Sequence, residues 1–199
     1  VLDTGATLSA LSNEAARKLG IKVPAHPVKV DLDTAGGRRR FPVVVVPRLR
    51  VGRAELRHVT VALCDDCSPV GLSGLLGLNF TQHFVTSIDQ KRRRLTLQAH
   101  RGPRNRIDDI EPFLRLAGVK GEAQGKRIHL TGRVKNRGPR KVKQLRLEVV
   151  LLDSAGKARG RKAHVIKKIP AGKGAPFEVK TDAPEGLTRY RIELLSATW

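Results

Sequence analysis

The sequence predicts a mainly β protein built from two units, and three observations lead to this prediction. Apolar and polar residues alternate with period two along several stretches, residues 28–32 being one example. Short apolar runs are separated by clusters of Gly, Pro, Asn and Asp, which is typical of antiparallel strands. Residues 99–110 are basic, contain Gly102-Pro103 and lack periodicity, so we expect a linker between residues 1–98 and 111–199.

In the first unit, a short helix is expected after the N-terminal turn. Ser12 suits its N-cap, Glu14 suits the positive end of the helix dipole, and Gly20 suits its end. A hairpin follows, with strands at 28–32 and 41–46 and a glycine-containing turn between them. The remaining predicted elements are a hairpin at 49–56, a strand at 59–63, a short helix at 79–84 and a closing hairpin at 87–97.

In the second unit, short strands separated by turns predict an antiparallel β-sandwich. The expected strands are 128–135, 142–152, 163–168, 175–180 and 189–195. The sequence of this unit shows neither an acid–base pair nor a metal-ligand cluster. His129 and His164 are isolated, which favours a packed or surface role over a ligand role.

The chain is strongly basic, with a formal net charge of +21. Residues 1–100 hold 15 basic and 8 acidic residues, whereas residues 101–199 hold 24 and 10. Such a balance fits either weak contact of the C-terminal half with an anionic surface or simply a solvated basic surface. Basic residues are not interleaved with aromatic ones, so no specific nucleic-acid partner is expected. Nothing approaches the roughly 20 apolar residues of a membrane span.

Cys64 and Cys67 form a Cys-x-x-Cys pattern, which can be redox-active, half of a zinc site or a small disulfide loop. Further Cys or His ligands at zinc-site spacing do not stand out, and the two intervening Asp residues disfavour a reactive thiolate. We therefore expect a loop disulfide or two unreactive thiols, and no metal or cofactor.

The most informative stretch lies at the start, where Val1-Leu2 leads into Asp3-Thr4-Gly5-Ala6. A carboxylate directly behind an apolar strand end is costly to bury without a partner. The apolar stretch Leu75-Leu76-Gly77 is its expected companion. Because the chain opens within this motif and lacks Met, we expect that a natural N-terminal strand, with any signal or anchor, is missing from it.

The Asp-Thr-Gly-Ala turn, the following helix, the Gly-tipped hairpin and Leu-Leu-Gly resemble, in this chain order, a retropepsin-like aspartic protease of the single-lobe type that includes bacterial members. The resemblance covers residues 1–98 and implies a closed β-barrel with short helices. It implies that Asp3 is catalytic. The other implied site residues are Thr4, Gly5 and Ala6 in the turn, Thr34, Ala35, Gly36 and Gly37 in a flap, and Leu75, Leu76 and Gly77 beneath the turn.

Aspartic proteolysis needs two carboxylates that share one proton, because like charges so close together resist joint ionisation. The chain contains no second Asp-Thr/Ser-Gly sequence. The resemblance therefore implies a homodimeric aspartic endopeptidase acting on peptides or proteins, with Asp3 contributed by each copy. The alternative is a non-catalytic protein with the same fold that binds peptides or polyanions.

In the second unit, residues 131–136, 147–153 and 169–172 resemble small immunoglobulin-like bacterial modules of the FxLYD type. This resemblance implies a role in binding, localisation or spacing. Together with a Cys64–Cys67 bridge, it would favour an envelope, periplasmic or secreted location.

Overall fold

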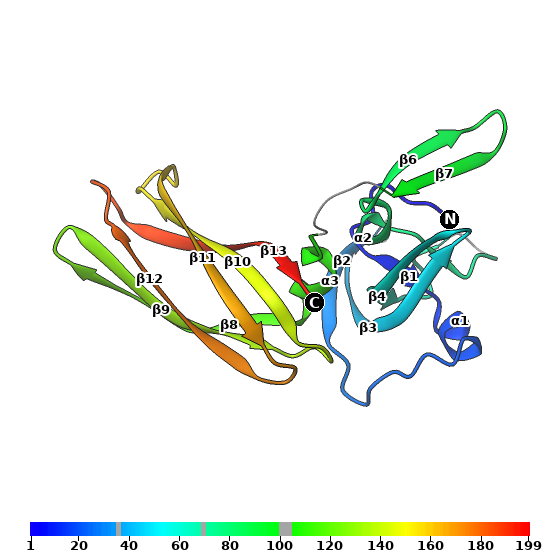
Figure 1. The fold of residues 1–199 in the computed structure, drawn as a ribbon, viewed down its shortest axis with the longest axis horizontal. Helices are drawn as coiled ribbons and strands as arrows, with labels where there is room; N and C mark the ends of the chain where they lie inside the picture. Colours follow the sequence, from blue (N-terminus) through cyan, green and yellow to red (C-terminus); the bar gives the residue numbers. More distant parts are fainter. Residues whose placement is uncertain (35–36, 69–70, 100–104) are drawn as a thin grey trace. The chain divides into compact units, whose positions relative to one another are not determined.

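The computed structural model describes residues 1–34, 37–68, 71–99 and 105–199 and consists mainly of β-strands, which confirms the predicted fold class (Figure 1). The chain divides into two compact units, Val1–Arg104 and Asn105–Trp199. The division falls inside the range predicted as a linker. Part of that range is nevertheless regular structure, because β7 (Arg94–Ala99) reaches its first residue and α3 (Ile107–Ile110) lies near its end.

The first unit contains a five-stranded sheet in the order β2-β3-β4-β1-β5. Its strands are β1 (Ser9–Leu11), β2 (Lys29–Thr34), β3 (Gly37–Val51), β4 (Ala54–Leu63) and β5 (Gly74–Leu75). β1 runs parallel to β4, and the other pairs are antiparallel. Among the described residues the sheet is open, with β2 and β5 at its edges, so the closed barrel implied by the resemblance is not found. β5 has only two residues, and β2 pairs with β3 alone.

Two short helices and a hairpin complete this unit. α1 (Asn13–Lys18) begins as predicted, because the Ser12 hydroxyl oxygen accepts a hydrogen bond from the Ala15 N–H at 3.1 Å. α2 (Leu78–Thr81) follows β5, and β6 (Phe84–Asp89) then pairs with β7. Phe80 of α2 is fully buried in the core cluster beside residues of β3 and β4.

Cys64 and Cys67 form a disulfide, which decides between the two outcomes that the sequence left open. The bridged loop contacts three neighbouring elements. The Cys64 N–H donates to the Leu11 carbonyl at 2.9 Å, and the Asp65 carboxylate accepts from the Asn13 N–H at 2.7 Å. Asp66 forms an ion pair with Arg39 of β3 at 2.6 Å. The loop therefore connects β1, the start of α1 and the hairpin β2–β3.

The second unit is a β-sandwich of two three-stranded sheets, ordered β11-β10-β13 and β12-β9-β8. The strands are β8 (Leu114–Gln124), β9 (Arg127–Asn136), β10 (Val142–Leu152), β11 (Ala158–Ile169), β12 (Gly174–Asp182) and β13 (Arg189–Thr198), preceded by α3 and the 3₁₀ turn η1 (Glu111–Phe113). Most of β8 was not predicted, because its side chains are largely exposed and it lacks an apolar period. The likeness to FxLYD modules stays a prediction.

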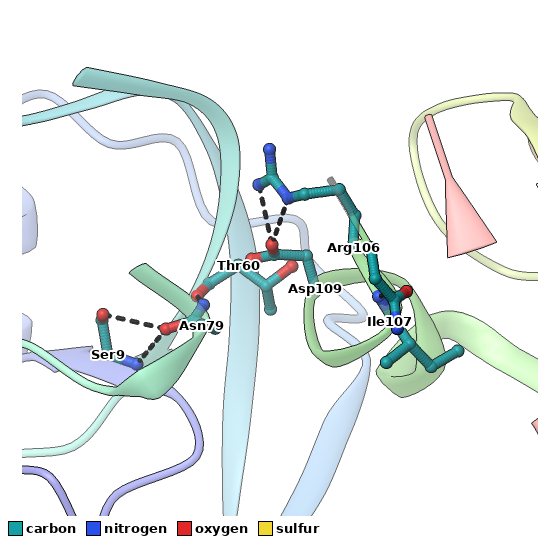
Figure 2. A network of polar contacts seen from close by, with 7 residues as sticks. Ser9, Thr60, Asn79, Arg106, Ile107 and Asp109 are labelled. Carbon is teal, nitrogen blue, oxygen red and sulfur yellow. Dashed lines mark hydrogen bonds and ion pairs between the residues drawn. The ribbon is translucent and has the colours of Figure 1, made fainter. Parts of the chain in front are cut away.

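The sandwich core is aliphatic, with Leu145 and Leu147 of β10 fully buried. A Cβ on Gly121 of β8 would come within 2.7 Å of the Tyr190 ring of β13, so glycine allows this approach between the two sheets. At the start of the unit, the Arg106 guanidinium and the Asp109 carboxylate form a buried ion pair at 2.7 Å (Figure 2). No helix among the described residues is long and apolar enough to cross a membrane.

Replacing Leu147 with Ala should lower the free energy of unfolding of the second unit by about 2–5 kcal/mol, since it leaves a cavity in a packed core. Trp199, the chain's one tryptophan, lies 8% exposed in this unit and reports the transition by fluorescence in urea. Val165→Ala is the control, because Val165 is 40% exposed. Equal losses in the two variants would contradict the described core.

Candidate active site

The backbone before the Asp3 turn is held by the segment that follows β5. Leu2 forms a parallel bridge with Leu76, the Asp3 N–H donates to the Leu76 carbonyl at 3.0 Å, and the Leu76 N–H donates to the Val1 carbonyl at 2.7 Å. The Gly5 N–H then donates to Asp3 Oδ1 at 2.9 Å. The turn therefore orients the Asp3 carboxylate, which is partly exposed.

Gly77 allows the two halves of this arrangement to approach closely. A Cβ at Gly77 would lie 2.6 Å from the Leu8 carbonyl carbon, a contact that side chains essentially never make. Next to this contact, the Leu78 N–H donates to the Ala6 carbonyl at 2.8 Å and the Asn79 N–H donates to the Thr7 carbonyl at 2.9 Å. The close approach of the two backbones therefore accounts for the glycine in Leu75-Leu76-Gly77.

The Asn79 side chain fixes the same region from within. Its Oδ1 accepts from the Ser9 N–H at 2.8 Å and from the Ser9 hydroxyl at 3.0 Å, as Figure 2 shows. Its Nδ2 donates to the Thr60 carbonyl of β4 at 2.7 Å. Asn79 and Thr60 are fully buried. One side-chain amide therefore ties the segment after the Asp3 turn to a central strand of the sheet.

A cleft of about 500 Å³ lies in front of the turn. Of the predicted site residues, those that line it are Asp3, Gly5, Ala6, Thr34 and Leu75. The structure thus brings the predicted turn together with Thr34 at the base of the predicted flap and with Leu75 of the Leu75-Leu76-Gly77 stretch.

The other predicted site residues lie outside this lining. Thr4 is exposed, Leu76 is partly buried and Gly77 is buried. Gly37 is exposed, and its carbonyl accepts a hydrogen bond from the Thr34 hydroxyl at 2.8 Å. The flap residues Ala35 and Gly36 lie outside the described residues.

Several residues of the site were not predicted. Asp31 and Asp33 of β2 and Asp66 of the disulfide loop line the cleft together with Asp3. Asp31 lies in the strand predicted at 28–32 and Asp33 lies directly after it, so their spacing of two residues is the only sequence signal that they share a face. Ser9 and Asn79 were also missed, because their contact joins residues separated by 70 positions.

Comparison with known proteins bears on the first unit. Residues 1–80 match the family model Asp_protease_2, described as an aspartyl protease, and this match supports an aspartic protease-like domain. A search of curated proteins found no match. Among solved structures, a DUF1425 family member from Shewanella sp. pv-4 is 12% identical with a TM-score of 0.35, covering 43% of this chain and 80% of that chain. This likeness is too weak to bear on function.

Replacing Asn79 with Ala should lower the free energy of unfolding of the first unit by about 2–4 kcal/mol, because it leaves buried groups of Ser9 and Thr60 without their partner. Far-UV circular dichroism in urea measures the loss. Asn13→Ala is the matched control, since Asn13 is exposed and its side-chain amide donates a hydrogen bond to the Asp65 carboxylate at the surface. A loss no larger than that of the control would contradict a structural role of the Asn79 amide.

Proposed function

We propose that the first unit is an aspartic endopeptidase that hydrolyses peptide bonds as a homodimer, with Asp3 of each copy supplying one carboxylate. The observation that supports this most directly is the Asp3 carboxylate in its glycine turn, at the edge of a cleft and within the residues that match an aspartyl protease model. The cleft volume falls in the range of ligand-binding sites.

The proposed chemistry needs a second carboxylate in contact with Asp3, and a second copy would supply it. Two carboxylates in contact ionise in sequence, so that one is charged and the other keeps its proton at working pH. A two-fold axis beside the Asp3 turn would place two identical turns against each other and give this arrangement. Asp31 and Asp66 line the same cleft but form ion pairs with Arg40 and Arg39. They are therefore poorer candidates for sharing a proton with Asp3.

Within such a pair, the charged Asp3 removes a proton from a water molecule held between the two carboxylates. The oxygen of this water attacks the peptide carbonyl carbon, while the protonated Asp3 donates a hydrogen bond to the carbonyl oxygen. The proton then passes to the departing amide nitrogen, and the C–N bond breaks. One pair of groups thus activates the nucleophile and stabilises the developing charge.

The neighbouring residues take supporting roles in this proposal. Thr4 would hydrogen-bond across the dimer axis, and Gly5 and Ala6 would leave room for the substrate backbone. The flap at 34–37 would cover the bound peptide, and Leu75 and Leu76 would limit access of bulk water to the carboxylates.

Asp3→Asn should abolish cleavage of a peptide library, because the amide can neither remove nor donate the proton. In a mixture with an equal amount of this variant, wild-type activity should fall to about half, since random exchange puts half of the wild-type chains into mixed dimers. Product release is measured by mass spectrometry, and dimerisation by sedimentation.

Asp182→Asn is the matched control for both experiments, because Asp182 lies in the second unit with its side chain 93% exposed. Adding this variant to wild type should not lower the activity of the wild type. Cleavage that persists in Asp3→Asn, or an active wild type that sediments only as a monomer, would contradict the proposal, as would the absence of cleavage by the wild type.

A second candidate function, polyanion binding, is favoured by a basic hollow in the second unit. A pocket of about 380 Å³ is lined by Arg133, Lys135, Arg137 and Lys173, together with Asn136, Gly172 and Gly174. None of its four cationic side chains takes part in an ion pair between described residues. Their charge is thus available to an anionic polymer.

Replacing Arg133 and Lys135 together with Gln should weaken binding of polyphosphate, with affinity that also falls as salt increases. Isothermal titration at two salt concentrations measures both effects. Lys157→Gln with Lys162→Gln is the control of equal charge change, since both residues are exposed. Binding that is absent, independent of salt, or equally weakened by both double variants would contradict a site at this pocket.

A further inference from the structure

The candidate cleft has a charge opposite to that of the chain. Four of its lining residues are the carboxylates Asp3, Asp31, Asp33 and Asp66, and Lys, Arg and His are absent from the described lining. The whole chain carries 39 basic and 18 acidic residues. An acidic lining in so basic a protein creates a local potential that attracts cations and disfavours anionic ligands.

The carboxylates are arranged along a strand rather than around a point. Asp31 and Asp33 stand at alternate positions of β2, where burial also alternates, and both are exposed. Side chains two residues apart in a strand are separated by about 7 Å and point to the same face. Among the described residues, no group of three His, Cys, Asp or Glu converges closely enough to hold a metal ion.

β2 is also an edge strand of the five-stranded sheet, so its outer backbone groups have no strand partner among the described residues. An extended peptide can add to such an edge through main-chain hydrogen bonds, while its alternate side chains face the same side. The spacing of Asp31 and Asp33 then matches the spacing of two peptide side chains at positions i and i+2.

The three carboxylates beyond Asp3 differ in their partners. Asp66 lies 2.6 Å from Arg39, whose guanidinium also lies 5.5 Å from the centre of the Phe41 ring. Asp31 lies 3.4 Å from Arg40 in an exposed ion pair. Exposed ion pairs contribute little free energy, so a cationic side chain of the substrate can take the place of Arg40 beside Asp31. Asp33 takes part in no ion pair between described residues, although Arg38 stands opposite it on β3.

We infer that the cleft selects extended peptides carrying Lys or Arg at two positions separated by one residue, with Asp33 as the main specificity-determining carboxylate and Asp31 as the second. This inference rests on the proposed peptidase function for its consequence in catalysis. Binding of the peptide depends only on the cleft and can be measured separately.

The test compares four fluorescent peptides that differ only in a central triplet: Lys-Ala-Lys, Lys-Lys-Ala, Gln-Ala-Gln and Glu-Ala-Glu. Binding is measured by fluorescence anisotropy with the Asp3→Asn variant, which leaves the acidic strand intact, and kcat/KM is measured with the wild type. We expect Lys-Ala-Lys to bind about tenfold more tightly than Gln-Ala-Gln at low salt, with Lys-Lys-Ala between them and Glu-Ala-Glu weakest. The preference should decrease as salt increases.

Variants at position 33 separate recognition from folding. In the Asp3→Asn background, Asp33→Asn should weaken binding of Lys-Ala-Lys about threefold to tenfold and leave Gln-Ala-Gln unchanged. Asp33→Lys should raise the affinity for Glu-Ala-Glu, which a merely structural role of Asp33 would not do. Asp182→Asn removes the same charge from an exposed side chain of the second unit and should change neither affinity.

The outcomes distinguish this inference from the proposed function. Asp3-dependent cleavage without preference for Lys-Ala-Lys would overturn the inference and leave the peptidase intact. Binding that prefers Lys-Ala-Lys, in a wild type that cleaves none of the peptides, would support the inference and overturn the peptidase. Equal affinity for Lys-Ala-Lys and Lys-Lys-Ala would overturn the role of the alternating carboxylates.

Discussion

The position of the Asp3 turn depends on the buried side-chain amide of Asn79. This amide accepts two hydrogen bonds from Ser9 and donates one to the Thr60 carbonyl, so it joins the segment after the turn to β4. The bonds can form only because Gly77 lets its backbone approach Leu8. A buried amide bonded on both sides tolerates little displacement, because each lost bond would leave a polar group without water. The segment that follows the Asp3 turn is therefore held rigidly, and this restricts the position of the Asp3 carboxylate.

The sequence could predict the parts of this arrangement that local patterns specify. The N-cap at Ser12, the strands within β2 and β10, and the sandwich of the second unit all follow from short-range periodicity and turn residues. The residues around Asn79 could not be found this way, since Ser9 and Thr60 meet it only after long stretches of chain fold back. The open sheet also escaped prediction, because closure depends on which strands pair at the edges.

The acidic lining of the cleft could not be predicted from the sequence either. Asp31 and Asp33 reach it through an edge strand, whereas Asp66 reaches it through the loop closed by the disulfide. Each residue alone reads as an ordinary exposed carboxylate in a basic chain. Their common charge becomes informative only when the fold brings them to the same cleft. The ion pair between Asp66 and Arg39, at 2.6 Å, also links the disulfide loop to the hairpin that borders the cleft.

Net charge and local charge would place opposite demands on the proposed homodimer. Two copies with a formal charge of +21 each repel one another, and salt weakens this repulsion over a Debye length of about 8–10 Å. The attraction inferred between a cationic peptide and Asp33 would weaken under the same conditions. In the proposed dimer, pairing of the Asp3 carboxylates would therefore be favoured by higher ionic strength, and capture of a cationic peptide by lower ionic strength. The ion pairs of Asp66 with Arg39 and of Asp31 with Arg40 would reduce this conflict, because fewer unpaired like charges would meet if two clefts faced each other.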